Sequence, residues 1–128
     1  MIYIDTSVAL ARIFEEDRSP SESLWEEQLL SSRLLEYEVW TQIHASGRSK
    51  SHSEAARVLL VRVAFLELAP AVLARALDPF PISLRTLDAL HLASIEFVRG
   101  LGQEVELASY DERLLDAARR LGIPIASL

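Results

Sequence analysis

Two aspartates occupy the same kind of position near opposite ends of the chain, each at the turn that follows a short apolar segment. Asp5 follows the strand-like residues Met1–Ile4, and Asp111 follows the apolar segment VELA. Apolar residues at helical spacing follow both aspartates. An aspartate there can simply cap the helix, because its carboxylate accepts orphan N–H groups. In an open α/β sheet, however, ligands bind beyond the carboxyl ends of the strands, so both acids are candidates for a functional edge.

Two further acids lie within apolar helix-like segments. Asp88 stands in RTLDALHLAS and Glu38 in LLEYEVWTQIH. Because burying an unpaired charge is costly, such a carboxylate should be paired, protonated or bound to a cation. Arg85 offers Asp88 an ordinary i, i+3 ion pair. Glu36, on a different helical face, is an alternative to Glu38 as the functional acid of this segment, and the sequence does not decide between them.

Four carboxylates of this kind suit a hard divalent cation such as Mg²⁺ or Mn²⁺, which prefers oxygen ligands. Zinc is disfavoured because the chain has no cysteine and its histidines, at positions 44, 52 and 91, share no short ligand spacing. His91 is better interpreted as a core or hydrogen-bonded histidine, because the helix around it is apolar.

The length and composition predict one globular domain over residues 1–128. The chain has 128 residues and is 50% hydrophobic, enough for a sizeable core. The absence of cysteine fits a cytoplasmic protein. We expect neither a targeting segment nor a membrane span, since charged residues and prolines interrupt the apolar runs. A net charge of −6 argues against a nucleic-acid coat protein, though not against an enzyme that holds cations.

Short apolar runs alternate with amphipathic stretches, which is typical of an α/β fold with a mainly parallel sheet. We expect about five strands, at residues 1–4, 32–34, 64–68, 104–109 and 123–127. Six or seven helices are expected between them, including residues 19–30, 37–47, 51–61, 70–77, 83–100 and 110–122. A serine three places before Glu54 indicates a capping box at Ser51.

A family resemblance is carried by the segments MIYIDTSVAL and LRTLDALHLAS, by Glu38 between them, and by SYDERL after them. The chain resembles the PIN-domain ribonucleases, especially the VapC-type toxins of toxin–antitoxin pairs. The resemblance spans essentially the whole chain. It implies a three-layer α/β/α PIN-like fold and a Mg²⁺- or Mn²⁺-dependent endoribonuclease. It also implies an RNA substrate, a cognate antitoxin and a homodimer. The acidic cluster of the family carries over to Asp5, Glu38, Asp88 and Asp111.

One departure from the family pattern concerns the last acid. Many members carry Thr-x-Asn-x-x-Asp after the late strand, whereas here Ser109, Asp111 and Leu114 take those places. Asp111 is therefore the only local acid, and the number of metal ions stays open.

The hypothesised reaction is hydrolysis of an RNA phosphodiester bond by a metal-activated water. Thr6, Ser7 and Ser109 would orient the carboxylates by hydrogen bonds. Twelve of the thirteen basic residues are arginine, which grips phosphate through two hydrogen bonds. Three arginines near the acids in the sequence are expected to form a phosphate-guiding rim: Arg12, Arg85 and Arg113.

Two other classes of function stay open at this point. The chain could be a phosphotransfer domain that is phosphorylated on Asp5, although such domains usually carry Asp-x-Asp and Ser7 stands at the second place. It could also be a catalytically silent binding domain whose acids are caps and surface pairs. Apolar residues of the early helices are candidates for a dimer or antitoxin surface: Leu24, Trp25, Leu29 and Trp40.

Overall fold

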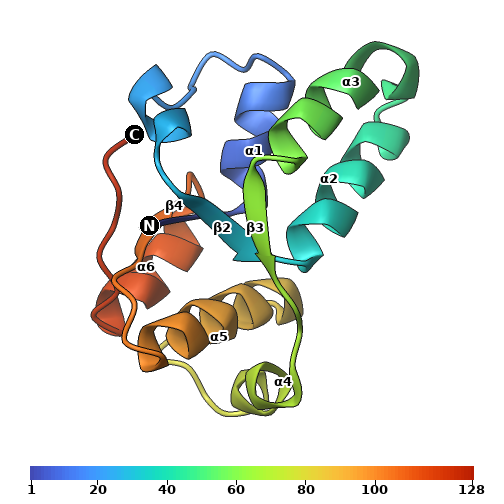
Figure 1. The fold of residues 1–128 in the computed structure, drawn as a ribbon. Coiled ribbons are helices and arrows are strands. Elements are labelled where there is room, and N and C mark those ends of the chain that lie inside the picture. The colour runs from blue at the N-terminus through green and yellow to red at the C-terminus, as the bar shows by residue number, and fades with distance from the viewer.

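Four parallel strands form one sheet in the order β3-β2-β1-β4 (Figure 1). The computed structural model describes all residues from Met1 to Leu128. The register places Ile4 opposite Ala108 and Tyr3 opposite both Leu30 and Leu107. All carboxyl ends therefore meet at one edge. The strands are β1 (Ile2–Ile4), β2 (Leu29–Ser32), β3 (Val63–Leu66) and β4 (Glu106–Ala108).

Helices cover both faces of the sheet, which confirms the expected three-layer arrangement (Figure 1). The first three helices pack on one face, and the last two pack on the other with α4 beside α5. The helices are α1 (Thr6–Ile13), α2 (Leu34–Ala45), α3 (Ser49–Leu60), α4 (Pro70–Ala76), α5 (Thr86–Gly100) and α6 (Glu112–Arg120), with a short 3-10 helix η1 (Glu22–Glu26).

The two faces of the sheet build two cores, because successive side chains of a strand point to opposite sides. Ile2 and Ile4 pack with α1, α2 and α3. Tyr3, between them, packs with Leu92 of α5 and Leu114 of α6. The central strand β1 thus contributes to both cores and is buried throughout.

The sheet has four strands where about five were expected. The expected last strand, residues 123–127, makes only a single bridge between Ile125 and Leu107. The expected helix over residues 19–30 is also wrong: η1 is short, and Leu29 begins strand β2. Leu29 and Leu30 pair with β1 on one side and β3 on the other, so sheet pairing overrides the local helix signals.

The capping box expected at Ser51 does not form. Helix α3 begins earlier, at Ser49, and Ser51 lies inside its first turn, where its hydroxyl donates to the carbonyl oxygen of Arg48. Likewise β2 ends at Ser32, and α2 begins at Leu34 where an extended segment was expected. None of the helices combines the length and apolar character needed to cross a membrane.

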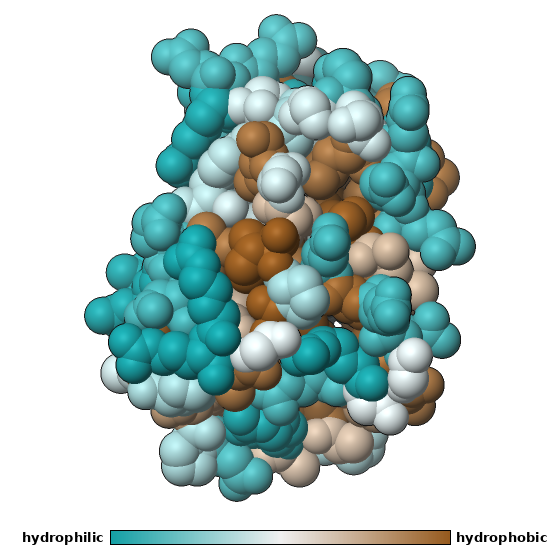
Figure 2. All heavy atoms as spheres, turned by 90° about the vertical axis from the view of Figure 1, so that its left-hand side faces the viewer, coloured by the Kyte–Doolittle hydropathy of each residue, from teal (hydrophilic) through white to brown (hydrophobic).

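The surface is not uniformly polar. Figure 2 shows apolar side chains gathered in the middle of the face that lies at the left of Figure 1, with hydrophilic side chains around them. Individual apolar side chains are also exposed elsewhere, notably Val61 after α3, Leu77 after α4 and Leu101 after α5.

Candidate active site

Asp5 is both the cap of a helix and a buried acid at the carboxyl edge of the sheet. It follows β1 and is only 5% exposed. Its Oδ1 accepts hydrogen bonds from the Ser7 hydroxyl, at 2.6 Å, and from the backbone N–H of Val8, at 3.1 Å. Its Oδ2 accepts one from the Ser109 hydroxyl at 2.5 Å. Burial nevertheless raises the pKa of Asp5 above its ordinary value, against the lowering effect of these donors.

The two strand–helix junctions are tied together through Ser7 and Ser109. The Ser7 hydroxyl accepts from the backbone N–H of Tyr110, and the Ser109 hydroxyl accepts from that of Asp111, both at 2.9 Å. The Asp111 carboxylate caps α6 by accepting hydrogen bonds from the backbone N–H groups of Arg113 and Leu114. Thr6 differs from the two serines, because its buried hydroxyl has no hydrogen-bond partner. It therefore orients no carboxylate in this structure.

Glu38 and Glu36 lie in different surroundings on α2. The Oε1 atom of Glu38 is 2.6 Å from Nε2 of His91, on α5. Glu36 instead forms an ion pair with Arg33 at 2.8 Å. His91 is 2% exposed, and its Nδ1 lies 2.7 Å from the Tyr3 hydroxyl. His91 is thus a buried, hydrogen-bonded histidine, as its apolar helix indicated, and it links Glu38 to the centre of the sheet.

Asp88 is half-buried near the start of α5, and it forms no ion pair with Arg85 or any other residue. Burial is the main cause that raises the pKa of Asp88, and the negative charges of Asp111, Asp5 and Glu38 raise it further. His91 opposes this in part. Asp111, Asp5 and Glu38 are therefore close enough to Asp88 to act on it electrostatically.

This donor set fits a hard divalent cation in chemistry and charge. The groups are carboxylates, and Asp88 has no other partner. Burial raises the pKa of both Asp5 and Asp88 and so favours their neutral forms. A cation would relieve that unfavourable charge. However, no group of three or more acidic or histidine side chains is already arranged to hold a metal ion.

The three arginines expected around the acids lie in different places. Arg85 stands at the N-cap of α5 and Arg113 in the first turn of α6, and both are exposed without an ion pair. Arg12 forms an ion pair with Glu22 at 2.5 Å and lies over the ring of Trp25. Only Arg85 and Arg113 therefore present unpaired guanidinium groups beside an acid of the site.

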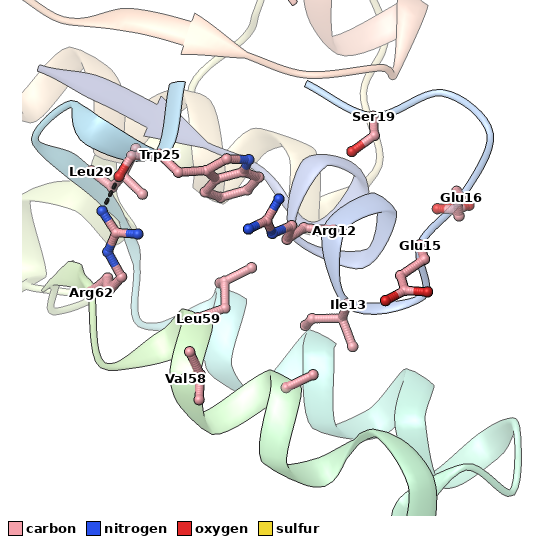
Figure 3. A pocket seen from close by; sticks show the side chains of 11 residues that line it. Arg12, Ile13, Glu15, Glu16, Ser19, Trp25, Leu29, Val58, Leu59 and Arg62 are labelled. Atoms are coloured by element: carbon pink, nitrogen blue, oxygen red, sulfur yellow. Dashed lines mark hydrogen bonds between the residues drawn. The ribbon is translucent and has the colours of Figure 1, made fainter. Parts of the chain in front are cut away.

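Arg12 belongs to a separate groove between α1, η1 and α3, with a volume of about 560 Å³ (Figure 3). Trp25, Leu29 and Leu59 form part of its lining, and Arg62 donates to the backbone carbonyl oxygen of Trp25. None of the four candidate carboxylates lines this groove. Trp25 and Leu29 are each only 5% exposed, as is Leu24, so the expectation that these three form an apolar surface is wrong, whereas Trp40 is only partly buried. All three belong to the core that packs with α1, α2 and α3, Leu29 because it begins strand β2.

The sequence of the chain matches the PIN domain over residues 2–121, and the chain belongs to the PIN domain family. Ribonuclease VapC46 of Mycobacterium tuberculosis (strain ATCC 25618 / H37Rv) is 32% identical over 128 residues, which cover 97% of this chain and 95% of that protein. Ribonuclease VapC47 of Mycobacterium tuberculosis (strain CDC 1551 / Oshkosh) is 30% identical over 134 residues, 99% of this chain and 96% of that protein. The resemblance inferred from the motifs is thereby confirmed.

Sequence reasoning missed the part that Tyr3 plays beside the acids. Tyr3 lies in a run of apolar residues, and nothing local distinguishes it from a core side chain. For His91 a signal was present: it follows Asp88 by three residues and so shares a helical face with it. Its partner Glu38, 53 positions earlier, becomes visible only when α2 and α5 are placed together.

Proposed function

We propose that this protein is a Mg²⁺- or Mn²⁺-dependent endoribonuclease and the toxin of a type II toxin–antitoxin pair. The observation that carries the proposal is that Asp111, Asp5 and Glu38 lie close enough to Asp88 for their charges to raise its pKa, at the carboxyl edge of a parallel sheet. The names of the VapC ribonucleases support RNA as the substrate. Residues 1–128 would form a single nuclease domain acting in the cytoplasm.

In this proposal the four carboxylates hold the metal, which, when bound, activates a water and offsets charge on the phosphate. Ser7 and Ser109 keep the Asp5 carboxylate in one orientation by donating to its two oxygens. The two serines also accept backbone N–H groups from the β4–α6 junction, which holds Asp111 beside Asp5. Arg85 and Arg113 would attract the phosphates on either side of the scissile bond.

The two other classes of function explain less of the site. A phosphoryl group would have to reach Asp5, whose oxygens accept three hydrogen bonds and which is 5% exposed. A silent domain would use its acids as caps and ion pairs. That account suits Asp111 but leaves the half-buried, unpartnered Asp88 without a role.

The proposed partners are an RNA, a cognate antitoxin and a second copy of the chain. Two exposed apolar side chains offer surface for association: Leu73 on α4, at 44%, and Leu77 directly after that helix, at 88%. Light scattering at micromolar concentration should give the mass of a dimer. A monomer at every concentration would contradict dimerisation and leave the nuclease proposal intact.

The nuclease proposal is tested with purified protein, a mixed RNA substrate and either Mn²⁺ or a chelator. Cleavage should require the metal, and both Asp5→Asn and Glu38→Gln should reduce it by orders of magnitude. Glu36→Gln is the matched control, because Glu36 is a neighbouring glutamate paired with Arg33, and it should keep wild-type activity. Full activity of Asp5→Asn in saturating Mn²⁺ would contradict the proposal. Beryllofluoride binding lost in Asp5→Asn would instead support phosphotransfer.

A further inference from the structure

A continuous row of hydrogen bonds connects the backbone of the sheet to Glu38. The backbone N–H of Ser32, at the end of β2, donates to the Tyr3 hydroxyl at 3.0 Å. The Tyr3 hydroxyl lies 2.7 Å from His91 Nδ1, and His91 Nε2 lies 2.6 Å from Glu38 Oε1. The row joins β2, β1, α5 and α2 through side chains.

With His91 neutral and Glu38 ionised, the donors and acceptors of this row have one consistent assignment. Because an ionised carboxylate only accepts, Nδ1 is the acceptor nitrogen of His91 and receives the proton of the Tyr3 hydroxyl, whose oxygen accepts the Ser32 N–H. His91 then carries its proton on Nε2 and donates it to Glu38 Oε1. Each member fixes the orientation of the next.

Glu38 is engaged through one oxygen only. Its Oε1 receives the His91 proton, while no hydrogen bond is made by Oε2. The side chain is 19% exposed, whereas those of His91 and Tyr3 are buried. The fixed oxygen therefore faces the core, and the second oxygen is available to a ligand.

We propose that His91, held in place by Tyr3, is a positioning residue that fixes the carboxylate of Glu38 for binding a divalent cation. The inference rests on the proposed function, because it gives Glu38 the task of holding that cation. Residues that orient metal ligands by hydrogen bonds typically change metal affinity by about 10- to 100-fold when they are removed. His91 and Glu38 should therefore act as one unit.

The test is Mn²⁺ binding by calorimetry, without RNA, for wild type, His91→Leu, Glu38→Gln and the double variant. We expect each single variant to lose about 10- to 100-fold in affinity. The double variant should bind no more weakly than Glu38→Gln, because His91 acts only through Glu38. Fold-losses that multiply in the double variant, or wild-type affinity in His91→Leu, would overturn the inference.

Three further variants separate positioning from folding. His91→Gln keeps a side-chain N–H donor and should recover part of the affinity lost in His91→Leu, although both disturb the core. Tyr3→Phe removes only a hydroxyl, so it keeps the inference testable if the His91 variants do not fold, and it too should weaken Mn²⁺ binding. His44→Leu is the matched control, since His44 is exposed on α2 and bonds to Ser49. It should bind Mn²⁺ like wild type.

The failure of this inference differs from the failure of the proposed function. If Glu38→Gln weakens Mn²⁺ binding while Tyr3→Phe and folded His91→Leu do not, the positioning role is refuted and the metal site stands. If wild type neither binds Mn²⁺ nor cleaves RNA, the metal site itself is refuted, and the positioning role with it.

Discussion

Ser109 donates its hydroxyl to Asp5 across 104 positions of sequence, joining the ends of two adjacent parallel strands. The bond satisfies Oδ2 of a carboxylate that is 5% exposed. It also counteracts the burial that raises the pKa of Asp5. This single contact therefore bears on the stability of the fold and on the charge of the site.

Ser109→Ala should destabilise the protein at neutral pH by about 1 to 3 kcal/mol, because it leaves a buried acceptor unsatisfied. It should also raise the pKa of Asp5 further, since the Ser109 hydrogen bond lowers it. Mn²⁺ binding and RNA cleavage should both weaken, as measured by calorimetry and a cleavage assay. Ser23→Ala is the matched control, because Ser23 is exposed and bonds only to Ser21. Unchanged stability and Mn²⁺ affinity in Ser109→Ala would contradict this prediction.

The local part of this site could be predicted from the sequence. The strand–acid–helix pattern at Asp5 and Asp111 lies within a few residues in each case, and the structure has both junctions. Their approach to each other depends on the parallel register that sets Ile4 beside Ala108. The late helices were predicted well because their apolar periodicity is long and uninterrupted.

The rest depended on contacts between distant segments. Residues 19–30 carry helix-start signals, yet Leu29 and Leu30 become a central strand because β1 and β3 pair with them. The choice between Glu36 and Glu38 could not be made along the chain, since both lie on α2. It depends on which face of α2 meets His91 and which meets Arg33.

Asp88→Asn should stabilise the metal-free protein at neutral pH. Burial and three negative charges raise the pKa of Asp88 above its usual 3.8, so its protonated form suits the fold. That contribution to stability is present in acid and is lost as the pH rises through the raised pKa. The melting temperature of Asp88→Asn should therefore exceed that of wild type at neutral pH and approach it in acid.

Added Mn²⁺ should reverse this order, because wild type gains stability from binding the ion and Asp88→Asn gains less. Asp116→Asn is the matched control: Asp116 lies on α6 in an ion pair with Arg120. Its melting temperature should not rise above that of wild type at neutral pH. A wild-type protein that stays more stable than Asp88→Asn in chelator at neutral pH would argue against a strained acidic cluster.

The last prediction concerns how a protein of net charge −6 holds an anionic RNA. Arg85 and Arg113 are exposed, unpaired and adjacent in sequence to the acids, whereas Arg12 is held by Glu22. In an Asp88→Asn background without metal, where RNA binds uncut, Arg85→Ala and Arg113→Ala should each weaken binding. Each should also reduce the slope of log affinity against log salt by about 1, as expected for a lost phosphate contact. Arg12→Ala should keep the parent slope, because its guanidinium contacts Glu22 and Trp25. If Arg12→Ala flattens the slope and the other two variants do not, RNA enters along the groove between α1, η1 and α3 instead.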